Sequence, residues 1–217
     1  MSKTRKAVRQ SISFPPLGHK HKALYPQFAP PETWRTRDFH IVIDGKTNSR
    51  IVWHKEDPLR WQKIRDRILS RDNHTCRYCG FEAPKWQVVH HIDGNPKNNG
   101  AQNLETVCPM CNLVLHAGRG CTVLRIVDLF KKSRHGQADV IRRTRVLRAS
   151  GASDQDIITK LVLEEKVSFK MDRRYLRRLT AFVSSRPPAR PDFMVRGLEY
   201  GYDEARRRSA SHEAKQP

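Results

Sequence analysis

The sequence is short of acidic side chains and has no long apolar segment. Its 217 residues contain 22 Asp and Glu against 42 Lys and Arg, a formal charge of +20 and a pI near 10.3. No apolar run approaches the roughly 18 residues needed to span a bilayer, and the N-terminus has no apolar core of a secretory signal. We therefore expect a cytoplasmic protein without membrane insertion. The charge favours a nucleic-acid partner, although a ribosome-associated protein, a membrane-surface binder or a solvated basic surface has the same composition.

The domain organisation follows from the distribution of charge and proline. No acidic residue precedes Glu32, and the basic residues and prolines there predict a flexible basic arm over residues 1–34. We expect a core with a preceding hairpin and helix over residues 35–125. A basic helical region over residues 135–186 and a mostly disordered tail over residues 187–217 complete the prediction.

Local patterns in the first half predict a hairpin and a helix. Two short apolar stretches, residues 38–43 and 50–54, flank a turn-rich segment and are typical of paired strands. Asp57 followed by Pro58 is an N-cap with proline at the first helical position, and apolar side chains then recur at helical spacing. Residues 122–127 are apolar enough for a strand or a short helix.

The second half is predicted to be helical. A basic helix over residues 141–148 ends near Gly151, and Ser153 caps a following helix that carries apolar residues as far as Leu163. Apolar residues at helical spacing within 175–182 predict a third helix with arginines on its exposed face. Such a pair of helices could read a DNA groove, but a helical layer packed on the core is the commoner arrangement.

The five cysteines give the strongest signal in the sequence. Four of them form two C-x-x-C pairs, Cys76 with Cys79 and Cys108 with Cys111, which in a reducing compartment indicate metal binding rather than disulfides. Two such turns can hold one zinc ion tetrahedrally through four sulfurs at about 2.3 Å. A redox dithiol is the alternative. Four cysteine ligands leave no open position for catalysis, so we predict a structural zinc and a non-ligand role for Cys121.

The loop between the two cysteine pairs must have structure of its own. An apolar stretch from Trp86 ends in His90 and His91, and a turn rich in Asn and Gly follows before Asn103. Neighbouring residues on a regular strand face opposite sides. The two histidines should therefore have one role each.

These residues resemble the HNH endonuclease family in order and approximate spacing, over residues 57–118. The matching motifs are Cys76-x-x-Cys79, His90-His91-Ile92, Asn103-Leu104 and Cys108-x-x-Cys111-Asn112. The resemblance implies an α+β fold, in which a zinc-braced ββα-metal (HNH) core carries an N-terminal hairpin and C-terminal helices. It also implies a metal-dependent endonuclease that hydrolyses phosphodiester bonds of DNA.

The same resemblance assigns roles to individual residues. His91 would be the general base that takes a proton from the attacking water, and Asn103 would hold the histidine-bearing loop. His90 and Asn112 would bind a catalytic Mg²⁺ or Mn²⁺ beside the scissile phosphate. His116 shares a helix face with Asn112 and is a possible accessory ligand.

Arg119 is a further candidate for contacting phosphate.

The sequence also resembles an HNH-like zinc protein of type IVB secretion coupling complexes, which is a part of an assembly. Under this alternative the chain is a catalytically silent component with a protein partner, or a nucleic-acid-binding module. The motif histidines can be lost in that branch, whereas all are present here, which favours catalysis without excluding a scaffold.

Overall fold

The computed structural model describes residues 21–27 and 58–189. The expected hairpin within residues 38–54, Asp57, most of the basic arm and the tail beyond residue 189 lie outside this part. The described elements, in chain order, are α2 (Pro58–Arg71), β1 (Val88–His91), η2 (Ala101–Asn103), β2 (Leu104–Val107), α3 (Pro109–Leu115), α4 (Ala117–Arg119), η3 (Gly120–Leu124), β3 (Val127–Lys132), α5 (Gln137–Ala149), α6 (Asp154–Lys160), β4 (Glu164–Val167), α7 (Arg173–Leu176) and β5 (Thr180–Val183). The fold is α+β, as predicted.

Helix α2 forms because proline starts it and an apolar stripe gives it a surface to bury. Ile68 and Leu69 are buried in one cluster with Val89 of β1 and Leu104 of β2, and Trp61 and Ile64 pack against that cluster. The predicted start at Pro58 is confirmed. The helix therefore covers one face of the β1–β2 hairpin.

Asp72 holds the C-terminal end of α2 to β2. Its carboxylate accepts hydrogen bonds from the Arg71 guanidinium at 2.9 Å and from the backbone N–H of Thr106 at 2.9 Å. Burial raises the pKa of Asp72, but the hydrogen bonds from Arg71 and Thr106 lower it more, so the net value lies below the usual one. After Asp72 the chain turns through left-handed residues, with φ of 49° at Asn73 and 50° at His74.

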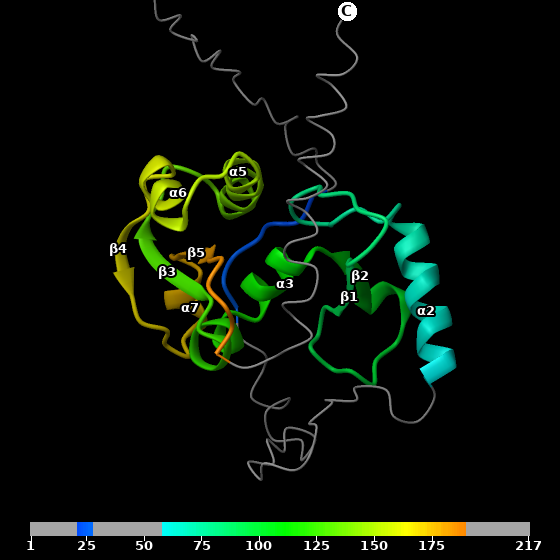
Figure 1. Ribbon diagram of the computed structural model, residues 1–217. Coiled ribbons are helices and arrows are strands. Elements are labelled where there is room, and N and C mark those ends of the chain that lie inside the picture. The colour runs from blue at the N-terminus through cyan, green and yellow to red at the C-terminus, as the bar shows by residue number, and fades with distance from the viewer. Residues whose placement is uncertain (1–20, 28–57, 190–217) are drawn as a thin grey trace, which may run out of the picture.

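The hairpin itself is antiparallel, and its register decides which residues share a face. His90 lies opposite Glu105, and His91 lies opposite Leu104. Because side chains alternate along a strand, His91 and Leu104 face α2, whereas His90 and Glu105 face the opposite side. Helix α3 follows β2 and lies on the far side of the hairpin from α2 (Figure 1).

The C-terminal half contains a second sheet that the sequence did not predict. Three antiparallel strands run in the order β4-β3-β5, with α5 and α6 beside them (Figure 1). Phe130 of β3, Val140 of α5, Ile157 of α6 and Phe182 of β5 are buried in one cluster. The prediction of a third helix over 175–182 is wrong, because α7 ends at Leu176 and the chain continues into strand β5.

Other local predictions in this half are confirmed or adjusted. Helix α5 contains the predicted 141–148 segment and ends before Gly151. Ser153 caps α6 in a capping box, since its hydroxyl accepts from the N–H of Asp156 and its own N–H donates to the Asp156 carboxylate. Helix α6 is shorter than predicted and leaves Leu163 beyond its end. Residues 122–127 span the end of η3 and the start of β3.

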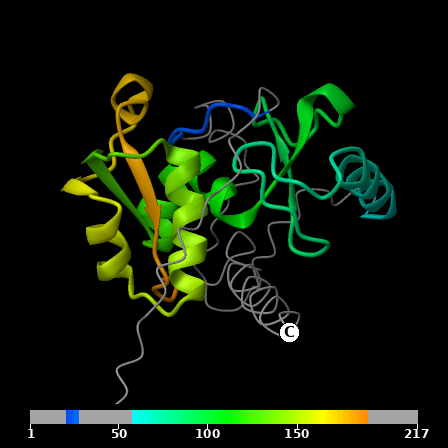
Figure 2. The same cartoon turned by 90° about the horizontal axis from the view of Figure 1, so that it is seen from above.

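The two sheets are joined through a common core and by an N-terminal segment. The largest buried cluster contains the four cysteines together with apolar residues of α3, β3, α5 and β5. Residues 21–27 run between the halves in both views (Figures 1 and 2). Lys22 N–H donates to the carbonyl of Arg77 at 3.0 Å, Gln27 N–H donates to that of Val114 at 3.1 Å, and the Tyr25 ring contacts the Arg177 guanidinium.

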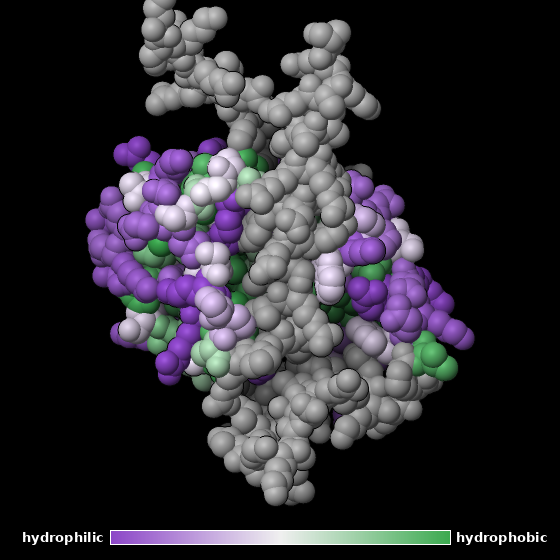
Figure 3. All heavy atoms as spheres, viewed as in Figure 1, coloured by the Kyte–Doolittle hydropathy of each residue, from purple (hydrophilic) through white to green (hydrophobic). Residues whose placement is uncertain are grey.

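The exposed surface is predominantly polar where the described residues are visible. In the view of Figure 3, hydrophilic side chains dominate over α6, β4 and α2. The arginines of residues 173–178 are exposed. Among the described helices, none combines the length and the apolar character that crossing a bilayer requires.

Candidate functional site

The four paired cysteines form a buried cluster between the hairpin and the C-terminal half. Cys76 and Cys79 lie on a tight turn that Gly80 closes with φ of 69°, and Gly80 N–H donates to the carbonyl of Cys76 at 3.0 Å. Cys108 is the N-cap of α3, and its sulfur accepts a hydrogen bond from the N–H of Cys111. Helix α3 therefore presents the second pair to the first.

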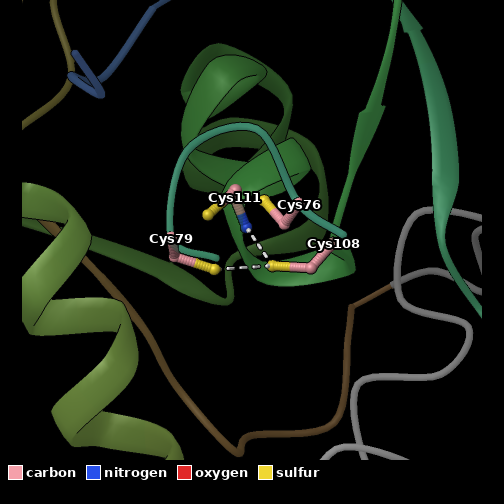
Figure 4. A group of neighbouring side chains, drawn as sticks. All are labelled: Cys76, Cys79, Cys108 and Cys111. Atoms are coloured by element: carbon pink, nitrogen blue, oxygen red, sulfur yellow. Dashed lines mark hydrogen bonds between the residues drawn. The ribbon is translucent and has the colours of Figure 1, made fainter. Parts of the chain in front are cut away.

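The positions of the sulfurs fit a single tetrahedral ion. The four Sγ atoms all lie within 4.8 Å of one another, and those of Cys79 and Cys108 are 3.6 Å apart. A zinc–sulfur distance of about 2.3 Å requires sulfurs about 3.8 Å apart. All four side chains point toward a common centre (Figure 4). The predicted ligand set is thus positioned to bind a metal such as zinc, which would fix the two turns against each other when bound.

The electrostatic environment favours one thiolate before any metal binds. Burial raises the pKa of the Cys108 thiol, but hydrogen bonds from the other three cysteines and the charge of Arg145 lower it well below the usual value. The hydrogen bond with Cys108 raises the pKa of Cys79. Burial followed by the bond with Cys108 raises that of Cys111. Metal binding at this cluster must therefore release protons. The fifth cysteine, Cys121, lies outside the cluster and packs against the core.

The two histidines of β1 face opposite sides, as predicted. His91 is largely buried, with 9% of the residue exposed. Its ring stacks on Trp61 with centroids 5.6 Å apart, and its Nε2 lies 3.0 Å from Oδ1 of Asn99. His90 is half-buried, and its ring meets that of His116 edge-on with centroids 5.1 Å apart.

Both imidazoles are neutral at physiological pH. Burial, followed by the charges of His91 and Lys22, lowers the pKa of His90 to about 4. Burial also lowers the pKa of His91, although the hydrogen bond with Asn99 and the charge of Asp93 oppose it. A neutral imidazole can bind a metal ion or accept a proton. The chemistry expected of both residues is therefore compatible with their protonation.

Asn103 holds the loop that follows the histidines. Its Oδ1 accepts from the N–H of Asp93 at 3.0 Å, and its Nδ2 donates to the Asp93 carboxylate at 2.9 Å and to the carbonyl of Asn98 at 2.8 Å. Asp93 also accepts from the N–H of Asn95 and from the Asn98 side chain. Asn103 thus makes the contacts expected of a loop-holding residue, and Asp93 is its partner.

Asn112 lies on α3 and His116 is the C-cap of that helix, where its N–H donates to the carbonyl of Asn112 at 2.9 Å. Asn112 is buried, and Arg119 is half-buried on α4. The structure therefore brings His116 to His90 from the helix that carries Asn112. Within residues 21–27 and 58–189, the four cysteines form the single group of three or more His, Cys, Asp or Glu side chains that could share a metal ion. In this part of the chain no further His, Cys, Asp or Glu side chain joins His90 and His116 in such a group.

Sequence reasoning missed a buried carboxylate on the His90 face. Glu105 is 2% exposed. It accepts hydrogen bonds from Nζ of Lys22 at 2.6 Å and from the hydroxyl of Tyr78 at 2.6 Å. Its position in an apolar β-strand segment gave no sign of this, because the lysine comes from the distant N-terminal segment.

Comparisons with known proteins give one partial likeness. No protein-family model matches the chain. The type 4 apparatus protein DotN of Legionella pneumophila is 38% identical over 52 residues, which make up 24% of this chain and 24% of DotN. The chain thus matches about a quarter of the length of that relative, and the likeness concerns one part of each protein.

Proposed function

We propose that this chain is a zinc-stabilised assembly component, which binds other proteins within a larger apparatus. The observation that carries the proposal is the partial likeness to DotN, an apparatus protein by name, in a chain with a buried four-cysteine cluster. Zinc with four cysteine ligands has no open position for substrate, so its contribution is to stabilise the fold. In this reading the metal maintains the surfaces that partners contact.

The charges on the His90 face support this reading. The ammonium of Lys22 binds Glu105, directly across the hairpin from His90, and it contributes to the low pKa of His90. A resident cation at this face opposes the approach of a divalent ion, because like charges repel strongly where water is partly excluded. The carboxylate that would attract such an ion is already neutralised by Lys22.

The environment of His91 also supports the assembly proposal. Its ring is stacked under Trp61 and held by Asn99, and these contacts give it a packing role in the cluster beneath α2. A general base must reach a water molecule at hydrogen-bond distance. For His91 that would require the Asn99 contact to rearrange.

The test is reconstitution with the proteins encoded beside the gene for this chain. We expect a complex of fixed stoichiometry in native mass spectrometry for the wild type and for Cys121→Ser, which leaves the metal ligands intact. Cys111→Ser removes one ligand and should abolish the complex together with zinc binding. A monomeric wild-type chain in every pairing contradicts the assembly proposal.

A second candidate is an HNH-type endonuclease acting on DNA, and one observation favours it: the His90 ring contacts the ring of His116, which ends the helix that carries Asn112. Here His90 and Asn112 would hold a divalent ion, which supplies charge stabilisation for the phosphate and the leaving oxygen. His91 would accept the proton of the attacking water. Two imidazoles and an amide suit Mn²⁺, Ni²⁺ or Zn²⁺ better than the predicted Mg²⁺, which prefers carboxylate oxygens.

Plasmid cleavage separates the two candidates. The zinc-loaded protein is incubated with supercoiled DNA and Mg²⁺, Mn²⁺ or Ni²⁺, alongside His91→Ala, His90→Ala and the control His135→Ala in the loop before α5. Cleavage that is lost in the first two variants and kept in the control would replace the assembly proposal by the nuclease. Absence of cleavage with every metal contradicts the nuclease.

A further inference from the structure

Arg145 of α5 places a buried positive charge beside the cysteine cluster. The residue is 5% exposed, and its guanidinium carbon lies 3.8 Å from the centroid of the Phe81 ring. Phe81 belongs to the first cysteine turn, because its carbonyl accepts a hydrogen bond from the N–H of Cys76 at 2.9 Å. A cation from the C-terminal half therefore reaches the centre formed by the other half.

The partners of Arg145 are sulfurs. Among the described residues no carboxylate forms an ion pair with it, and its Nε and Nη2 have no hydrogen-bond partner there. The groups that interact with its charge are the thiols of Cys108, Cys79 and Cys111. Two other arginines of α5 differ, since Arg142 pairs with Asp139 and Arg148 with Asp154.

A bound metal would give this arginine a counter-charge. Four thiolates around one divalent zinc carry a net charge of −2. A guanidinium buried without a counter-charge is strongly destabilising, while one beside a compact anion is stabilised. Sulfur also accepts N–H donors, and the Nε and Nη2 groups of Arg145 lack an acceptor among the described residues.

We propose that Arg145 is the outer-sphere cation of the four-cysteine metal site, and that it makes the docking of α5 on the cysteine turns depend on the bound metal. The inference requires a metal at the cysteines but no particular function for the protein. With zinc bound, the tetrathiolate attracts Arg145 and holds α5. Without zinc the four sulfurs are no longer held together as one compact anion, the attraction weakens, and α5 loosens. By linkage, the arginine strengthens zinc binding to the same extent that zinc strengthens the docking.

The first experiment measures zinc release from the full-length, zinc-loaded protein to a chromogenic chelator. Arg145→Met keeps the length and removes the charge, Arg145→Lys keeps the charge, and Arg143→Met is the matched control on the exposed side of α5. Outer-shell partners are worth about 10- to 100-fold in metal affinity. We expect Arg145→Met to release zinc faster by a factor in that range, Arg145→Lys to fall between, and Arg143→Met to match wild type. Equal release by the Met variants of Arg145 and Arg143 overturns the proposal.

The second experiment needs no variant. Hydrogen exchange of the α5 amides is compared in wild type before and after zinc is chelated, with the capped helix α6 as an internal reference. We expect α5 to lose protection more than α6 does. Equal loss in both helices means general unfolding, and unchanged protection of α5 means that docking is independent of the metal; either result overturns the proposal even where Arg145→Met does not fold.

Discussion

Replacement of Glu105 by glutamine should lower the free energy of unfolding by about 2–3 kcal/mol, because the substitution removes a charge that two hydrogen bonds need. The carboxylate is 2% exposed, and each of its oxygens accepts one bond at 2.6 Å, from Lys22 and from Tyr78. Glutamine has the same shape but a single acceptor oxygen. One of the two donors must therefore lose its partner.

The two donors differ in what that loss costs. The Lys22 side chain is 42% exposed, so its ammonium can return to water, and its pairing contributes about 1 kcal/mol or less. Tyr78 is 6% exposed and cannot reach water, and a hydrogen bond to a buried charged group contributes roughly 1.5–3 kcal/mol. Burial and the bond to Glu105 together raise the pKa of the Tyr78 hydroxyl, which keeps it a donor at any physiological pH.

Denaturation of the zinc-loaded protein by urea measures what the Tyr78 and Lys22 hydrogen bonds each contribute to stability. Two double-mutant cycles, Glu105→Gln with Tyr78→Phe and Glu105→Gln with Lys22→Met, give the coupling energies separately. We expect the tyrosine coupling to exceed the lysine coupling by at least about 1 kcal/mol. A Glu105→Gln variant within about 0.5 kcal/mol of wild type, or a larger lysine coupling, would refute the argument from burial.

Three further predictions concern the cysteine cluster, Asp72 and Gly120. Cys111→Ser should abolish stoichiometric zinc in elemental analysis and lower the melting temperature, whereas chelation of wild type should give the same melting temperature as that variant. Asp72→Asn should cost about 1–3 kcal/mol at neutral pH. The folded pKa of Asp72 is lowered, so its contribution is complete above the unfolded pKa of about 3.9 and disappears as pH falls through the folded value. The denaturation curves of variant and wild type should therefore converge as pH falls below that unfolded pKa. Gly120→Ala should cost about 1–3 kcal/mol in thermal melts, because a Cβ there would lie 2.5 Å from Cγ2 of Val127; an unchanged melting temperature would show that Val127 moves freely.

The features that the sequence predicted correctly are those encoded by neighbouring residues. Cysteine spacing predicts the cluster because a C-x-x-C turn needs no other part of the chain, and the Ser153 capping box is local for the same reason. The segment 175–182 was predicted wrongly because short apolar patterns fit a helix or a strand equally well. Whether this segment forms a helix or a strand depends on β3, with which residues 180–183 pair.

The roles of Arg145 and Glu105 could not be predicted, for a related reason. A buried charge is tolerated because of its partners, and here the partners are remote in the sequence. Arg145 looks like one of several surface arginines of a basic helix until α5 is packed against the cysteine turns. Glu105 looks like a surface residue of a hairpin until Lys22 crosses it.

The opposite orientation of the two β1 histidines also bears on how such a protein can change during evolution. His91 fills space beneath Trp61, so selection for a stable core preserves it whether or not any reaction is catalysed. His90 and His116 face the other side, where both are half-buried and a substitution would remove a ring contact at little cost to the core. A lineage that lost catalysis would therefore keep His91 longest. The presence of both histidines is thus better evidence for the structure of the hairpin than for an activity.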